Sequence, residues 1–166
     1  SCLHSSKPGK VYRELESVDL EALRPRSGRL VLPPVLERIQ SMGFKVFTNG
    51  DYNLNLFGIR SPDRVSGTYD DLLGCAYKVD GQWNVRYWAA TTDPSLYYRE
   101  NPANVKGTAI LVPGQYSGVY TIDMHAGKYL ALCQRNGPVT VWRDNDLDRV
   151  LDEDFETDTG YFGINI

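Results

Sequence analysis

Short runs of alternating apolar and polar residues, separated by turn dipeptides, restrict the fold of this chain more than any other feature. Residues 72–79 and 82–91 are two such runs, with Asp80-Gly81 between them. Asp-Gly in this position is a strong signal for a β-hairpin. Similar runs cover residues 44–47, 54–60, 108–112, 118–125, 129–134, 138–144 and 161–166, and the later turns contain Pro113-Gly114, Ala126-Gly127 and Asn136-Gly137. This pattern predicts a mainly β protein with an antiparallel β-sandwich or barrel-like core.

One short N-terminal helix is expected before these strands, within residues 33–43. The segment begins with two prolines and ends on Gly43, as helices often do. Its apolar residues recur at helical spacing: Val35, Leu36, Ile39 and Met42. We therefore expect a short amphipathic helix at the start of a β-rich domain that spans residues 33–166.

Residues 1–32 have a different composition from the rest of the chain. They are polar and rich in turn formers, and they offer at most one short helix around Asp19–Leu23. We predict that this segment is an arm or linker. Its basic residues, Arg24, Arg26 and Arg29, are interrupted by Pro and Gly, which is typical of a solvated linker. A net charge of −3 also argues against a nucleic-acid partner.

The length and the cysteine pattern exclude several classes of protein. The 166 residues suffice for one domain with a proper core. No run approaches the roughly 20 apolar residues of a membrane-spanning helix, so no membrane span is expected. Cys2, Cys75 and Cys133 form no metal-binding or disulfide pattern. Because Cys75 and Cys133 lie within apolar runs, we expect both to be buried as small hydrophobic residues.

The acidic stretch 143–154 is the sharpest local motif. It places aspartates at positions 1, 3, 5 and 9 of a loop: Asp144, Asp146, Asp148 and Asp152. Calcium prefers several oxygen ligands at such spacing, so we predict that these four residues bind Ca²⁺. The loop departs from an EF-hand, since Arg149 replaces the usual Gly and Phe155 replaces the usual Glu. The alternative interpretation is a solvated acidic turn.

Three further residues are predicted to contact a ligand. Tyr97 and Tyr98 lie in the polar stretch 91–102 between strands, where binding residues often occur. His125 ends a predicted strand, and Asp123 on the same strand face could orient its ring. No serine or cysteine adjacent in sequence offers itself as a nucleophile, and a histidine in an ordinary turn is the alternative.

Two segments resemble a known family. Residues 106–122, KGTAILVPGQYSGVYTI, and residues 159–166, TGYFGINI, resemble parts of the L,D-transpeptidase catalytic domain. That family has a Thr-Pro-x-Gly-x-Tyr/Phe stretch and later a strand that ends Tyr-Gly-Ile-His. Val112 stands where the family prefers Thr. From about Gly43 to Ile166 the chain also resembles uncharacterised bacterial and phage proteins.

The resemblance implies a cell-wall function, in which a cysteine-dependent enzyme acts on peptidoglycan. A thiolate from a Ser-x-Gly-Cys motif would attack a stem peptide, with a histidine as base. Those residues match no position here, so the resemblance implies that the natural chain continues past Ile166 and that these 166 residues are inactive. It also implies a cell-envelope, secreted or virion-associated location. The alternative is a non-enzymatic virion or cell-surface β module, stabilised by calcium, that binds glycan or protein.

Overall fold

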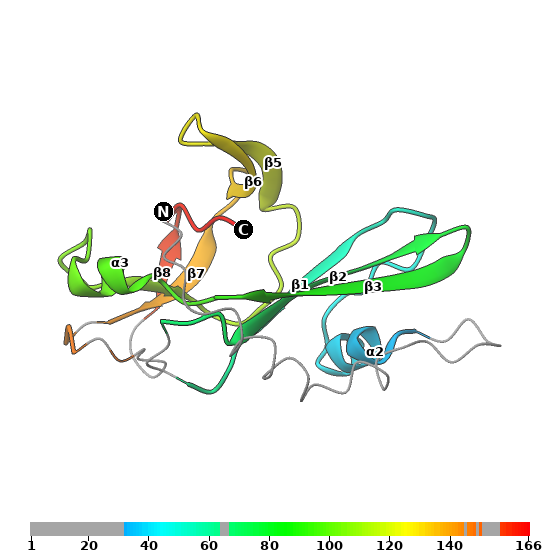
Figure 1. The fold of residues 1–166 in the computed structure, drawn as a ribbon, viewed down its shortest axis with the longest axis horizontal. Coiled ribbons are helices and arrows are strands. Elements are labelled where there is room, and N and C mark those ends of the chain that lie inside the picture. Colours follow the sequence, from blue (N-terminus) through cyan, green and yellow to red (C-terminus); the bar gives the residue numbers. More distant parts are fainter. Residues whose placement is uncertain (1–31, 64–66, 145, 149, 151–156) are drawn as a thin grey trace. The chain divides into compact units, whose positions relative to one another are not determined.

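The computed structural model describes residues 32–63, 67–144, 146–148, 150 and 157–166 (Figure 1). The chain divides into two compact units, which are described separately: residues 1–61 with 68–92, and residues 62–67 with 93–166. The described strands form three antiparallel sheets, none of which closes into a barrel. The predicted mainly β, antiparallel fold with a short N-terminal helix is therefore confirmed. The predicted arm, residues 1–32, falls almost wholly outside the described residues.

The first unit contains the sheet β1–β2–β3, formed by Asn55–Ile59, Asp71–Val79 and Gln82–Ala90. The predicted hairpin joins β2 and β3, and both of its turn residues have positive φ, 51° at Asp80 and 72° at Gly81. Asp51 accepts the backbone N–H groups of these two residues at 2.8 and 3.0 Å. The turn is thus fixed both by its own sequence and by a carboxylate from another loop.

Helix α2, Pro34–Ser41, lies on one side of this sheet (Figure 1). It begins with proline as predicted, and Leu36 is fully buried. Met42 was expected on the apolar face of the helix, but it follows the last turn and is exposed. Residues 44–47 were expected to form a strand and do not; the side chain of Asn55 instead binds both backbone groups of Phe47.

The end of this sheet is closed by a buried carboxylate. Asp71 accepts hydrogen bonds from the backbone N–H groups of Ser61 and Thr92 and from the Thr92 hydroxyl. Arg60 Nε donates to the same hydroxyl at 3.0 Å. The two chain segments that leave the sheet are thereby tied to the first residue of β2.

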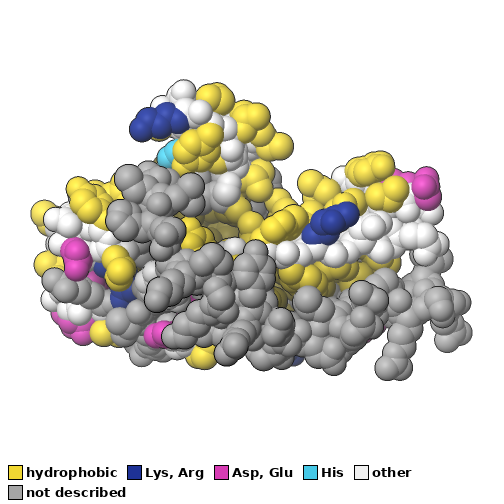
Figure 2. Space-filling model, in the orientation of Figure 1, with side chains coloured by type: hydrophobic (Ala, Val, Ile, Leu, Met, Phe, Trp, Pro, Cys, Tyr) yellow, Lys and Arg dark blue, Asp and Glu magenta, His cyan; other side chains and the backbone are white. Residues whose placement is uncertain are grey.

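The second unit contains the sheet β4–β7–β8, formed by Ala109–Leu111, Val139–Arg143 and Asp158–Gly160, and the hairpin β5–β6, formed by Tyr120–His125 and Tyr129–Gln134. The short helix α3, Leu96–Glu100, precedes them. The core of this unit is built on Val119, Val139 and Val141. Hydrophobic side chains also gather on the outside of the β5–β6 hairpin, at the top of Figure 2, and include the exposed Ile122 and Leu130.

The chain does not form one strand from Tyr161 to Ile166, as its alternating pattern suggested. The strand β8 ends at Gly160, and Gly163 has φ +68°, a conformation incompatible with a continuous strand. The last residues nevertheless remain paired. Leu132 of β6 and Ile166 exchange two backbone hydrogen bonds of 2.9 Å. The terminal segment is therefore held beside β6 rather than within β8.

The described part of the chain contains no helix with the length and apolar character needed to cross a bilayer.

Candidate functional site

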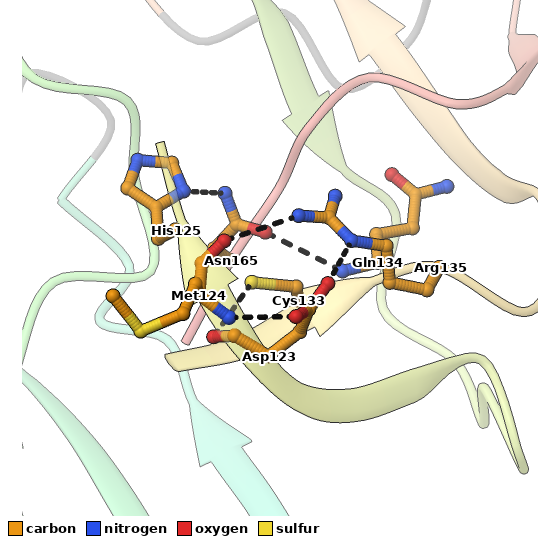
Figure 3. A network of polar contacts seen from close by, with 7 residues as sticks. All are labelled: Asp123, Met124, His125, Cys133, Gln134, Arg135 and Asn165. Carbon is orange, nitrogen blue, oxygen red and sulfur yellow. Dashed lines mark hydrogen bonds and ion pairs between the residues drawn. The ribbon is translucent and has the colours of Figure 1, made fainter. Parts of the chain in front are cut away.

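The hairpin β5–β6 and the terminal segment bring several polar side chains together (Figure 3). Strand β5 supplies Asp123 and His125, and β6 supplies Cys133. Arg135 follows β6 directly, and Asn165 forms an isolated β-bridge with Cys133.

His125 has Asn165 as its polar partner. The side-chain nitrogen Nδ2 of Asn165 lies 2.9 Å from Nδ1 of His125. The same nitrogen donates to the carbonyl oxygen of Gly163 at 2.8 Å. Because an amide nitrogen only donates, Nδ1 is the acceptor and the proton of the neutral ring lies on Nε2. The ring also packs against Tyr129, with centroids 5.2 Å apart. The structure therefore gives His125 one defined tautomer, with Nε2–H as its donor.

Asp123 does not orient His125, so that expectation from sequence was wrong. Arg135 Nε donates to its carboxylate at 2.8 Å, and the backbone N–H of Met124 donates to the second oxygen at 2.8 Å. The hydrogen bond from Arg135, followed by that from Met124, lowers the pKa of Asp123 below its ordinary value. Residues two apart on one strand face are separated by about 7 Å, which explains why a cross-strand partner reaches the carboxylate instead.

Cys133 is a core residue, as predicted. It is 0 % exposed, and its thiol lies 3.6 Å from the carbonyl oxygen of Asp123, to which it can donate. A nucleophilic cysteine needs a thiolate with access to substrate, and this position gives no access. Cys75 is buried as well, and burial raises the pKa of its thiol. Both predictions of buried cysteines are thus confirmed.

The two predicted tyrosines are exposed on α3. The rings of Tyr97 and Tyr98 are edge to face, with centroids 5.3 Å apart. The backbone beneath them is fixed, because the hydroxyl of Thr108 donates to the carbonyl oxygen of Tyr98. Among the described residues, no hydrogen bond or ring contact joins this pair to His125. Two of the three predicted ligand-binding residues thus contact each other, and no direct contact joins His125 to them in this part of the chain.

Three of the four predicted calcium ligands come together after β7. Carboxylate oxygens of Asp144, Asp146 and Asp148 all lie within 4.8 Å of one another. Asp144 is buried and the other two are exposed. Asp152 lies outside the described residues. Converging carboxylates can hold a hard cation such as Ca²⁺, so the arrangement is compatible with the predicted site, which stays a prediction.

A glycine allows Asp144 to reach this position. The backbone N–H of Asp144 donates to the carbonyl oxygen of Thr108 at 3.1 Å. Gly107 has φ +87°, and a Cβ there would lie 1.7 Å from the carbonyl oxygen of Asp144. The Gly107 carbonyl is in turn bound by Arg143 Nη1 at 3.0 Å. Only glycine therefore permits the close approach that sets the backbone of the acidic loop.

Comparison with known proteins adds no assignment. No protein-family model, no curated protein and no solved structure matches this chain. The resemblance to L,D-transpeptidases therefore stays a prediction from the sequence.

Two residues that organise this region, Asn165 and Gln134, were not predicted from the sequence. The amide nitrogen of the buried Gln134 donates to the carbonyl oxygens of Gly137 and Gly160, at 3.1 and 2.8 Å. Its amide oxygen accepts the backbone N–H of Phe162 at 3.0 Å. One side chain thus joins β6 to β8 and to the terminal segment. The signal in the sequence was a polar amide placed within, or at the end of, an apolar run. Such an amide is buried together with the run, and a buried amide needs hydrogen-bond partners.

Proposed function

We propose that this chain is the β core of a peptidoglycan-active domain similar to the L,D-transpeptidases, and that its described residues bind the cell-wall polymer. The pairing of Leu132 with Ile166 carries the proposal. It holds the end of the segment that resembles the family against β6, and Asn165 in that segment contacts His125. In the family, the corresponding strand leads to the catalytic histidine, so a paired segment is what the resemblance requires.

The side chains of this unit suit a polymer of amides, carboxylates and sugars. The Nε2–H of His125 is a donor for a carbonyl or carboxylate oxygen, and Asn165 fixes its direction. The exposed rings of Tyr97 and Tyr98 offer π-faces on which the C–H groups of a sugar can stack. These contacts give binding and orientation.

Bond-making chemistry is not supported at the described thiols. Cys133 is fully buried and faces a backbone carbonyl, so neither a substrate nor a base reaches it. His125 has one ring nitrogen engaged by Asn165. We therefore expect this 166-residue chain to bind muropeptides without turning them over.

The test is co-sedimentation of the chain with purified sacculi, together with chromatography of added muropeptides. We expect the chain to sediment with sacculi, and His125→Ala and Tyr97→Ala to weaken this binding. Tyr161→Ala removes another exposed tyrosine of the same unit and serves as the matched control. A chain that stays in the supernatant would contradict the proposal. Turnover that disappears in Cys133→Ala would also contradict it, because it would assign chemistry to a core thiol.

A second candidate is a non-enzymatic virion or cell-surface module that is stabilised by calcium. It is favoured by the convergence of Asp144, Asp146 and Asp148. The two candidates differ in their ligands: the module would respond to Ca²⁺ and would bind a protein or a glycan other than peptidoglycan, so it would not sediment with sacculi. Both measurements on one preparation therefore separate them.

A further inference from the structure

The sheet β1–β2–β3 of the first unit has two unlike faces. Side chains alternate between the faces along each strand, and the register places Asn55 and Ala76 on one face. Both are buried. Leu56 and Arg86 belong to the other face, where they flank the buried Cys75, and both are exposed. The face that contains Leu56 and Arg86 is called the open face below.

The open face is aromatic at both ends. At one end Trp88, which is 50 % exposed, lies opposite Leu73. At the other end Tyr77 lies opposite Asn84, and the ring of Tyr52 stacks on that of Tyr77 with centroids 6.3 Å apart and an interplanar angle of 21°. Tyr52 is 67 % exposed, so this stacked pair also presents a ring to solvent.

The distance between the two aromatic ends follows from the register. The row of Tyr77 and the row of Trp88 are four residues apart along β2, which corresponds to about 13 Å. Arg86 stands in the row between them. Gly58 shares the row of Trp88 and adds no side chain to the surface. In Figure 2 hydrophobic side chains lie along the upper side of this sheet, with basic atoms among them.

We propose that the open face binds an extended oligosaccharide that carries carboxylate groups. Sugar rings stack on Trp88 and on the Tyr52–Tyr77 pair, and Arg86 pairs with a carboxylate of the bound chain. This inference deepens the proposed function and rests on it, since the glycan strand of peptidoglycan is a polymer of this kind. It adds a sugar-binding surface on the first unit, whereas His125 and the α3 tyrosines belong to the second unit.

Charge complementarity favours such a glycan over an apolar partner surface. An apolar partner would remove the guanidinium of Arg86 from water without giving it a counter-charge, which is costly. A carboxylated sugar supplies that charge, with the planar, bidentate geometry that arginine prefers. The C–H faces of its rings also match the negative π-faces of Trp and Tyr. One ligand class thus satisfies both aromatic ends of the face and the arginine between them.

The experiment measures binding of two soluble probes by isothermal titration calorimetry. The probes are chitohexaose, which is neutral, and glycan strands released from sacculi by an amidase, which carry muramyl carboxylates. We expect Trp88→Ala to weaken both probes about tenfold, the loss that corresponds to one aromatic stacking contact. Arg86→Ala should weaken only the carboxylated strands. Trp88→Phe keeps an aromatic ring and should retain most of the affinity.

The matched control is Trp83→Ala. Trp83 lies on the same strand but on the opposite face, where Lys78 Nζ sits 5.1 Å from its ring centroid. Its removal should leave the affinity for both probes unchanged, and thermal melting of each variant verifies folding. If neither probe binds, the proposal is overturned. An equal loss of affinity in Trp83→Ala and Trp88→Ala also overturns it. Self-association that Trp88→Ala abolishes also overturns it, by showing that a second copy covers this face.

The two proposals fail in different ways. If sacculi bind through His125 and Tyr97 while Trp88→Ala has no effect, the open face is not a glycan site and the proposed function stands. If the soluble strands bind through Trp88 while intact sacculi do not bind, the open face is a carbohydrate site and the proposed function fails.

Discussion

Asn165 donates a hydrogen bond to Nδ1 of His125, although the two residues are 40 positions apart in the sequence. The bond links the end of the β5 strand to the segment that pairs with β6. It also selects which ring nitrogen carries the proton, because the amide can only donate.

The first prediction concerns this tautomer. In the parent protein, at a pH where the imidazole ring is uncharged, ¹⁵N chemical shifts should show that His125 carries its proton on Nε2 alone. Asn165→Ala removes the donor, so the same spectrum should show a mixture of tautomers. His4 provides an internal reference from the same sample. Identical spectra for the two proteins would show that Asn165 does not hold the ring.

The second prediction concerns Gln134. Its side chain is buried and makes three hydrogen bonds. Gln134→Ala therefore leaves two carbonyl oxygens and one backbone N–H without their hydrogen-bond partner. Each unsatisfied buried group costs up to about 3 kcal/mol. We expect Gln134→Ala to lower the free energy of unfolding by roughly 2–4 kcal/mol in total. Urea denaturation measures the change. Gln82→Ala alters an exposed glutamine and should change stability by less than about 0.5 kcal/mol.

The third prediction concerns acid stability. Arg135 lowers the pKa of Asp123 below its ordinary value of 3.8. A carboxyl group with a depressed folded-state pKa adds stability that is fully present above the unfolded value. That contribution is lost as the pH falls through the folded-state pKa. Asp123→Asn should therefore be less stable than the parent at pH 7 and equal to it in strong acid. A difference that persists unchanged at low pH would contradict this linkage.

The fourth prediction concerns Tyr120. Its hydroxyl is buried and makes no hydrogen bond to the residues that the structure describes. Burial, with a smaller contribution from Tyr116, raises its pKa above 10.0. Tyr120→Phe should be as stable as the parent or more stable by up to about 1 kcal/mol at pH 7.

The same tyrosine makes stability fall at alkaline pH. In the unfolded chain Tyr120 ionises above about pH 10, whereas in the folded chain its raised pKa keeps it protonated to higher pH. The free energy of unfolding therefore declines as the pH rises. The phenylalanine variant should decline less steeply. Chemical denaturation at pH 7 and pH 10.5 measures both effects, and a marked loss at pH 7 would show that the hydroxyl has a partner.

The fifth prediction concerns the acidic loop. If Asp144, Asp146 and Asp148 bind calcium, the ion stabilises the fold by about 2.7 kcal/mol at a hundredfold excess over its dissociation constant. Melting temperature should then rise in millimolar Ca²⁺, and Asp146→Ala should abolish the rise. Asp63→Ala removes an exposed aspartate outside the cluster, and this variant should show the same rise in melting temperature as the parent. Equal melting curves in Ca²⁺ and in chelator would contradict the prediction.

Local chemistry decided which features the sequence could predict. The Asp80-Gly81 turn, the α2 helix and the convergence of three aspartates depend on neighbouring residues, and all three were anticipated. The partners of His125 and Asp123 were not, because they come from the terminal segment and from the residue after β6, and their positions depend on register. The alternating pattern of residues 161–166 was also misleading, since one glycine with positive φ outweighs the pattern.

The ion pair of Asp123 with Arg135 has a consequence for solubility. Asp123 binds the backbone N–H of Met124, and Arg135 Nη2 lies 3.5 Å from the carbonyl oxygen of Met124. An incoming strand could not use these two backbone groups without displacing the pair. Strands with open hydrogen-bonding edges recruit other chains into aggregates, and the neighbouring Ile122 would make such recruitment favourable. The charged pair therefore acts as a gatekeeper that keeps this apolar hairpin from seeding intermolecular sheets.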